Sequence, residues 1–193
     1  CVEIETPDLK VLCDPWFTEG VYDGSWYHWP PVPDDPIDYV GKVDAIWVSH
    51  IHPDHYDPVF LHAYLRKYPE TRLLIGELDT PHLHRKMLAD GFSPEVESKV
   101  TVGDTELRVF ASHYQSDQNI DSSLVVAHGN ESVLNLNDAG LSPGDLHAIR
   151  EFCTPTVGLL PYSGAGPFPQ AFLIPDRAEF AESKRQTSLE IFE

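Results

Sequence analysis

One segment constrains this chain more than any other: residues 47–58, WVSHIHPDHYDP, in which three histidines and an aspartate follow an apolar run. These residues, His50, His52, Asp54 and His55, form the pattern H-x-H-x-D-H. The run before them, residues 43–49, is short and rich in β-formers, which predicts a buried strand. Side chains at strand ends project into the crevice where α/β proteins commonly place their sites. We therefore expect the imidazoles and the carboxylate to face one functional crevice.

The spacing and the donor types of this motif indicate a metal site. In an extended segment His50 and His52 point the same way, because they are two residues apart. Asp54 and His55 are adjacent and can serve a second position beside the first. Nitrogen and oxygen donors together suit Zn, Fe or Mn rather than Mg or Ca alone. The alternative of ordinary loop histidines fits a lone histidine better than three with a carboxylate after a strand.

Two distant residues repeat the arrangement of an apolar strand followed by a ligand-type side chain. His113 ends the run LRVFASH, and Asp138 ends VLNLND. Each signal alone is weak, since Asp138 also fits a turn before Gly140. Together with the first motif they predict that His113 and Asp138 supply further ligands. The remaining histidines lack this context: His28, His62, His82, His84, His128 and His147.

Alternating strand and helix signals predict the fold class. We expect strands at residues 9–13, 43–49, 72–76, 98–102, 106–111, 122–127, 132–136 and 156–160, with a turn at 128–131. We expect helices at 57–69, 80–91, 142–153 and 177–188, the first three opened by Asp57, Thr80 and Ser142. Strands interleaved with helices, then antiparallel pairs, then strand and helix again suit a layered α/β sandwich better than a purely parallel sheet.

Two loops are candidates for a substrate pocket. Residues 18–38 combine aromatic side chains with prolines, which is typical of a loop that covers something, or of one whose aromatics only anchor it to the core. Backbone amides of the loop SGAG, residues 163–166, could meet a phosphate or carboxylate, although a simple tight turn explains this loop slightly better. The pocket candidates are Trp26, Trp29, Tyr162, Ser163 and Gly164.

Length and composition bound the remaining expectations. A chain of 193 residues suits one domain, residues 1–193, with its own core. A formal charge of -18 repels phosphate backbones, so we expect no nucleic-acid partner. The partner that we expect is a small-molecule substrate. No apolar run reaches the length of a transmembrane segment. Three cysteines without C-x-x-C spacing favour the reducing cytoplasm. The sequence does not indicate the oligomeric state.

The H-x-H-x-D-H motif, with a downstream histidine and then an aspartate, resembles the metallo-β-lactamase superfamily. That resemblance implies a four-layered αββα sandwich, here expected to be incomplete at the C-terminus because the chain starts without Met and ends without a closing element. It also implies one metal held by His50, His52 and His113, a second position formed by Asp54 and His55, and a bridging Asp138.

The resemblance also leaves a gap in the ligand set. Members of the superfamily usually supply one more histidine near the C-terminus. After Asp138 the candidate is His147, which lies inside a predicted helix. The last ligand is therefore either on a missing C-terminal segment or absent.

Longer segments resemble one branch of that superfamily, the CMP-N-acetylneuraminate hydroxylase-like proteins. The similar segments are residues 14–31, 49–76, 133–140 and 161–169. Enzymes of this branch pair a Rieske iron–sulfur domain with a metallo-β-lactamase-like domain, and this chain contains no Rieske cysteine–histidine pairs. Other related branches are hydrolases: lactonases acting on sugar phosphates and a phospholipase D acting on N-acyl ethanolamine lipids.

Three functions follow from these patterns. The leading hypothesis is a hydrolase in which one or two transition-metal ions, zinc first and iron or manganese next, activate water against an ester, lactone or phosphodiester. Asp54 would be its catalytic residue, orienting the water or binding the second metal. The second hypothesis is an iron-dependent hydroxylase, since the same donors suit iron. The third is a non-catalytic metal-binding module, which the missing histidine motivates.

Overall fold

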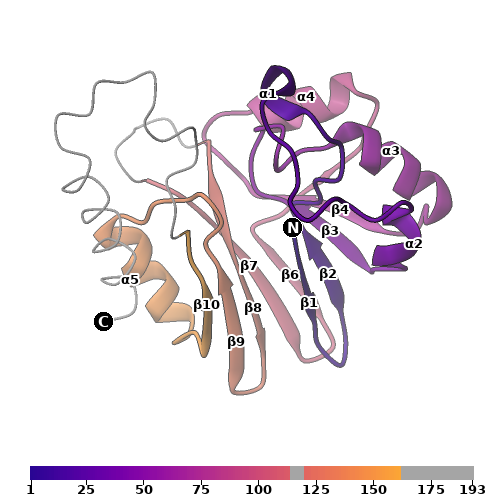
Figure 1. The fold of residues 1–193 in the computed structure, drawn as a ribbon. Helices are drawn as coiled ribbons and strands as arrows, with labels where there is room; N and C mark the ends of the chain where they lie inside the picture. Colours follow the sequence, from indigo (N-terminus) through magenta and orange to yellow (C-terminus); the bar gives the residue numbers. More distant parts are fainter. Residues whose placement is uncertain (114–119, 162–193) are drawn as a thin grey trace, which may run out of the picture.

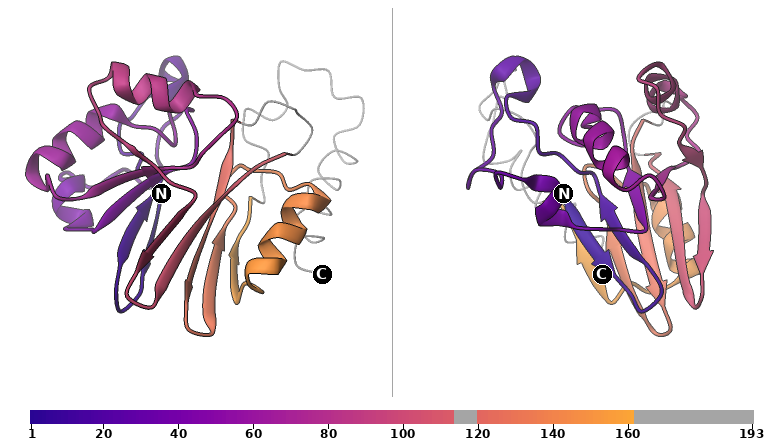
Figure 2. Two further views of the ribbon diagram at one scale, coloured as in Figure 1. Left: turned by 180° about the vertical axis from the view of Figure 1, so that it is seen from behind. Right: turned by 90° about the vertical axis from the view of Figure 1, so that its right-hand side faces the viewer.

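The computed structural model describes residues 1–113 and 120–161 (Figure 1). Two five-stranded sheets lie face to face, with helices on both outer faces (Figures 1 and 2). This arrangement confirms the predicted four-layered αββα sandwich. The expected helix at residues 177–188 and the pocket candidates Tyr162, Ser163 and Gly164 lie outside the described residues.

The first sheet contains the strand that leads into the histidine motif. Its order is β1 (Val2–Glu5), β2 (Lys10–Cys13), β3 (Ala45–Val48), β4 (Arg72–Ile75) and β5 (Glu95–Val96). The β1–β2 pair is antiparallel, and all other neighbours in this sheet are parallel. The helices on the side of this sheet are α2 (Pro36–Val40), α3 (Pro58–Lys67) and α4 (His82–Ala89). Because β2, β3 and β4 are parallel, their carboxyl ends share one edge.

The second sheet brings later parts of the chain to the same edge. Its order is β10 (Val157–Leu159), β9 (Glu131–Asn135), β8 (Ser122–His128), β7 (Thr105–Ala111) and β6 (Lys99–Val102). All neighbours are antiparallel except β9 and β10. Helix α5 (Pro143–Phe152) covers its outer face (Figure 1). His128 pairs with Glu131, so the β8–β9 turn consists of Gly129 and Asn130 and is shorter than predicted.

Three apolar clusters hold the layers together. Strand β3 is buried along its whole length because both of its faces are covered: Trp47 points to the second sheet, and Ile46 points to α3. Strand β8 is also covered on both faces and is buried over residues 122–126, with Leu124 between the sheets and Val125 under α5. Continuous apolar runs are therefore the expected sequence of these strands. In the described part of the chain, no helix has the length and apolar character needed to cross a membrane.

Helix starts follow the predicted capping residues in two of three cases. The Asp57 side chain accepts a hydrogen bond from the Phe60 backbone N–H at 3.0 Å, and it also binds the backbone N–H of Thr18 at 2.8 Å. It thus caps α3 and anchors the aromatic segment. Ser142 caps α5 in a capping box. The predicted cap at Thr80 is wrong: α4 begins after Pro81, without a side-chain cap.

Candidate metal centre

Four strand ends converge where the two sheets meet at one edge. The Asp14 backbone N–H, just after β2, donates to the Trp47 carbonyl at 2.9 Å. The Ser122 hydroxyl at the start of β8 donates to the Ser49 carbonyl at 2.9 Å. The Asn137 side-chain amide, after β9, donates to the Ser122 carbonyl at 2.7 Å. These bonds fix the loops that carry the predicted metal ligands next to one another.

Three predicted ligands form a compact group within this edge. His50, His55 and Asp138 each offer one donor atom, and the three atoms lie within 4.8 Å of one another. His55 Nε2 is 3.2 Å from Asp138 Oδ2, and the His50 and His55 ring centroids are 4.2 Å apart. Two imidazoles and one carboxylate are the donors of many non-haem iron sites and of some catalytic zinc sites.

The other two residues of the motif lie beside this group. His50 Nε2 is 2.8 Å from His52 Nδ1, and the Nδ1 atom of His50 is 2.9 Å from the Ser49 hydroxyl. Asp54 Oδ2 is 3.4 Å from His55 Nε2. The predicted motif therefore presents three imidazoles and one carboxylate in direct contact with one another.

His113 lies apart from these contacts. Its Nδ1 atom is 2.6 Å from Asp145 Oδ1, and its backbone N–H donates to Asp145 Oδ2 at 3.0 Å. Its side chain is 59% exposed, whereas that of Asp145 is 6% exposed at the start of α5. The shared metal with His50 and His52 that the resemblance implies stays a prediction.

Asp14, which the sequence analysis did not single out, holds the motif in place. Its Oδ2 atom is 3.1 Å from His55 Nδ1 and accepts a hydrogen bond from the Ser49 hydroxyl at 2.9 Å. Its Oδ1 atom accepts from the Ser49 backbone N–H at 2.7 Å. Asp14 follows the apolar strand β2 directly, so the strand-end pattern that indicated Asp138 applies to it as well.

Asp121 is the second residue that the sequence analysis missed. Its Oδ1 atom is buried, lies 3.7 Å from His50 Nε2 and has no hydrogen-bond partner among the described residues. Asp121 precedes β8, whereas the strand-end pattern indicates only residues that follow a strand. The pattern therefore does not predict Asp121. Because Ser122 pairs with Ala111 at the end of the antiparallel strand β7, the start of β8 lies at the same edge.

The electrostatics of the group favour a cation. Burial lowers the pKa of His55, but hydrogen bonds to Asp138, Asp14 and Asp54 outweigh burial and raise that pKa to about 11. Burial and, second, the neighbouring His55 lower the pKa of His50 to about 4. The carboxylates thus stabilise positive charge at one point while an adjacent imidazole stays neutral, as metal ligands must.

The pKa values of Asp54 and Asp121 shift in opposite directions. Burial raises the pKa of Asp54, but hydrogen bonds from His55 and Tyr22 outweigh it and bring that pKa to about 2. Burial raises the pKa of Asp121, whose Oδ1 atom has no hydrogen-bond partner in the described part of the chain. An orphaned carboxylate oxygen beside a neutral imidazole, together with the nitrogen and oxygen donors, fits a transition-metal ion.

The aromatic segment reaches this group through Tyr22. The Tyr22 hydroxyl donates to Asp54 Oδ1 at 2.7 Å, and its ring is 4.9 Å from that of Trp26. Tyr22 lies in the short helix α1 (Val21–Gly24) with a left-handed backbone, φ 54°. Trp26 is half-buried, and Trp29 is 92% exposed. A role of either tryptophan in a substrate pocket stays a prediction.

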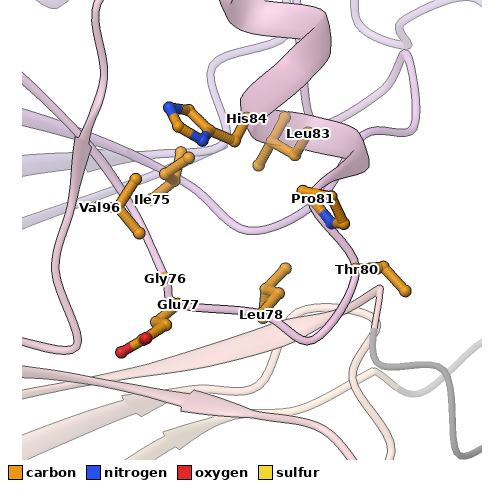
Figure 3. Close-up of a pocket in the computed structure, with 9 residues that line it drawn as sticks. All are labelled: Ile75, Gly76, Glu77, Leu78, Thr80, Pro81, Leu83, His84 and Val96. Carbon is orange, nitrogen blue, oxygen red and sulfur yellow. The ribbon is translucent and has the colours of Figure 1, made fainter.

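A small, mostly apolar cavity of about 70 Å³ lies beyond the end of β4 (Figure 3). It shares no residue with the motif or with Asp14, Asp121 and Asp138. Its lining residues are Ile75, Gly76, Glu77, Leu78, Thr80, Pro81, Leu83, His84 and Val96.

Comparison with known sequences finds no matching family model. A protein of Mycolicibacterium smegmatis, named provisionally as a Rieske 2Fe-2S iron–sulfur protein, is 34% identical over 199 residues, which cover 97% of this chain and 38% of that protein. A likewise named protein of Mycobacterium tuberculosis gives the same identity and coverage over 202 residues. The cytidine monophosphate-N-acetylneuraminic acid hydroxylase of Asterias rubens is 30% identical over 81 residues, 42% of this chain and 12% of that enzyme. The chain thus spans about 38% of the length of the first two relatives.

Solved structures show the same architecture at low sequence identity. An isothiocyanate hydrolase from Delia radicum gut bacteria has a TM-score of 0.61 at 17% identity, covering 82% of this chain and 67% of that one. A variant of the β-hydroxylase CmlA has a TM-score of 0.54 at 18% identity, covering 95% and 39%. A possible metal-dependent hydrolase from Veillonella parvula has a TM-score of 0.58 at 15% identity, covering 81% and 66%. With the H-x-H-x-D-H motif at the shared edge of its two sheets, the chain has the metallo-β-lactamase fold.

Proposed function

We propose that the chain binds iron at this centre and hydroxylates a small molecule, with electrons from a Rieske-type cluster. The sequence relatives carry this proposal: proteins named for a Rieske cluster match 97% of the chain at 34% identity. A named hydroxylase also matches 42% of it. The donor set is compatible with iron but does not choose it, because zinc enzymes use the same side chains.

The residues divide into ligands and supports. His50, His55 and Asp138 would hold one ion, and His52 and Asp54 would provide a neighbouring position for a second. When bound, iron supplies the activation of dioxygen, and hydroxylation of a C–H bond then consumes two electrons and two protons and releases one water. A Rieske cluster is an electron carrier of suitable chemistry.

Supporting residues orient these ligands. Asp14 engages His55 Nδ1, so Nε2 of the same ring is left for the ion. The Tyr22 hydroxyl holds one oxygen of Asp54, so the other oxygen faces His55. Asp54 would orient water or bind the second ion, which are the two roles that we propose for this carboxylate. Burial of His50 keeps its imidazole neutral and able to bind metal.

A metal-dependent hydrolase is the second candidate. The TM-scores of 0.61 and 0.58 to structures named as hydrolases favour it. Two histidines and one carboxylate with an open position also form a catalytic zinc site. The substrate would then be an ester, lactone or phosphodiester, and Asp54 would accept a proton from the attacking water.

Metal content separates these candidates. The protein is purified from cells grown without metal supplements, and iron and zinc are measured by elemental analysis beside a His50→Ala variant. We expect iron in about stoichiometric amount in the wild type and a large loss of it in the variant. Stoichiometric zinc without iron would contradict the hydroxylase and favour the hydrolase. Absence of both metals, with no binding on addition, would contradict all three hypotheses, because each of them requires a bound metal.

A further inference from the structure

We infer that Asp121 is a ligand of the metal centre and binds the same ion as His50. This inference rests on the metal-binding part of the proposed function and is independent of the reaction. The resemblance implies that His113 shares a metal with His50 and His52, and the bond from His113 to Asp145 occupies only Nδ1, so Nε2 is left for such an ion. The structure places a further donor atom, Asp121 Oδ1, beside His50.

The backbone holds Asp121 at this place. The Ser112 backbone N–H donates to the Asp121 carbonyl at 3.0 Å, which closes the end of the β7–β8 pair. The next residue, Ser122, is fully buried and donates its hydroxyl to the Ser49 carbonyl at 2.9 Å. Asp121 is therefore anchored on one side to β7 and on the other to the residue that precedes His50.

A metal ion would provide a partner for one oxygen of the Asp121 carboxylate. Its Oδ1 atom is buried and has no hydrogen-bond partner within residues 1–113 and 120–161. A buried carboxylate oxygen without a partner is costly, so native proteins pair such atoms or use them to bind metals. Asp14 provides the contrast, because bonds from Ser49 and His55 occupy both of its oxygens. We therefore assign Asp14 as a positioning residue and Asp121 as a ligand.

The distances agree with a shared ion. Asp121 Oδ1 lies 3.7 Å from His50 Nε2, which is too long for a hydrogen bond. Two donors about 2.1 Å from one tetrahedral ion are roughly 3.4 Å apart, so a small side-chain adjustment lets one ion contact both atoms. His52 Nδ1 lies 2.8 Å from His50 Nε2, so the neighbouring position that His52 would help to form adjoins this ion.

The test measures metal binding rather than activity. The apoprotein is titrated with Co²⁺, and the affinity is obtained by competition with a chelator while the visible spectrum reports the ligand set. The variants are Asp121→Asn, which keeps the shape but loses the charge, and Asp104→Asn, a matched change in the exposed β6–β7 turn at the other end of β7. We expect Asp121→Asn to weaken Co²⁺ binding at least about tenfold and to shift the spectrum. Asp104→Asn should bind as the wild type does.

The outcomes distinguish this inference from the proposed function. A wild type that binds no Co²⁺, Fe²⁺ or Zn²⁺ would refute the metal centre itself. Binding by the wild type with an unchanged affinity and spectrum in Asp121→Asn would refute the role of Asp121 alone. If Asp121→Asn does not fold, a crystal structure of the Co²⁺-loaded wild type decides the question. A carboxylate oxygen of Asp121 within about 2.3 Å of the ion supports the inference, and one beyond about 3 Å overturns it.

Discussion

Asp14 Oδ2 lies 3.1 Å from His55 Nδ1, and the opposite nitrogen of the same ring lies 3.2 Å from Asp138 and 3.4 Å from Asp54. One side of the imidazole is thus held by a buried carboxylate, and the other faces the cluster of ligands. Carboxylates that orient metal-binding histidines commonly affect metal affinity without touching the metal.

The first prediction concerns this pair. Asp14→Asn replaces an acceptor by an amide and leaves His55 without its fixed orientation. We expect Co²⁺ affinity to fall about 10- to 100-fold, measured by chelator competition. The spectrum of bound Co²⁺ should change little, because Asp14 is not a ligand. An affinity equal to that of the wild type would show that Asp14 does not orient His55.

The second prediction concerns a buried hydroxyl under α3. The Tyr64 hydroxyl accepts from the Val43 backbone N–H and donates to the Gly41 carbonyl, both at 2.8 Å. Tyr64→Phe leaves both backbone groups without this partner, so we expect a loss of about 1–3 kcal/mol in the free energy of unfolding by urea. Tyr39→Phe is the control, because Tyr39 is 73% exposed. A loss no larger than that of Tyr39→Phe would refute the role of this hydroxyl.

The third prediction concerns the close approach of the two sheets at Gly76, which lines the cavity in Figure 3. A Cβ atom at this position would lie 2.5 Å from the Val109 Cγ1 atom. Gly76→Ala should therefore cost about 1–3 kcal/mol in the free energy of unfolding. Adding Val109→Ala should recover part of that loss in a double-mutant cycle. Additive effects of the two changes would contradict a direct clash.

The fourth prediction concerns acid stability. Hydrogen bonds from Lys86, at 2.6 Å, and from Tyr56, at 2.6 Å, lower the pKa of Asp90 in the folded protein. The Asp90 carboxylate therefore contributes to stability above its pKa in the unfolded chain, about 3.9. This contribution is lost as the pH falls through the lower pKa that Asp90 has in the folded protein. Asp90→Asn should destabilise the protein by up to about 1 kcal/mol at pH 7, since the Lys86 pair is largely exposed.

The pH series provides the check on Asp90. The difference in unfolding free energy between wild type and Asp90→Asn should shrink as the pH is lowered from about 5 to about 2. In a Lys86→Gln background the difference at pH 7 should be smaller from the outset. A difference that stays constant across this range would mean that the Asp90 carboxylate is not stabilised by folding.

Much of the fold could be predicted because its central strands are buried on both faces. The apolar runs in β3 and β8 are buried between layers, and Asp57 and Ser142 mark helix starts by a local hydrogen bond. The strands β1 and β5 were not predicted, since β1 buries only Ile4 and β5 has two exposed residues. Backbone pairing with a neighbouring strand defines both, and that pairing leaves little mark on the sequence.

The candidate site could be predicted only where donors share a short segment or follow a strand. His50 and His55 belong to one motif, and Asp138 follows the strand-end pattern into the same group. The direction of His113 depends on Asp145, 32 residues later, which spacing does not reveal. Asp121 was not predicted because it lies at the start of a strand, and antiparallel pairing brings that start to the site.

Anomalous diffraction from crystals of the protein purified without added metal tests the central claim most directly. Data on both sides of the iron absorption edge locate and identify the bound ion. We predict one iron peak within about 2.3 Å of His50 and His55 nitrogens and an Asp138 oxygen, with a second peak beside His52 or Asp54 if the centre is dinuclear. Well-ordered crystals without any peak among these side chains, or with the metal bound elsewhere, would contradict this account.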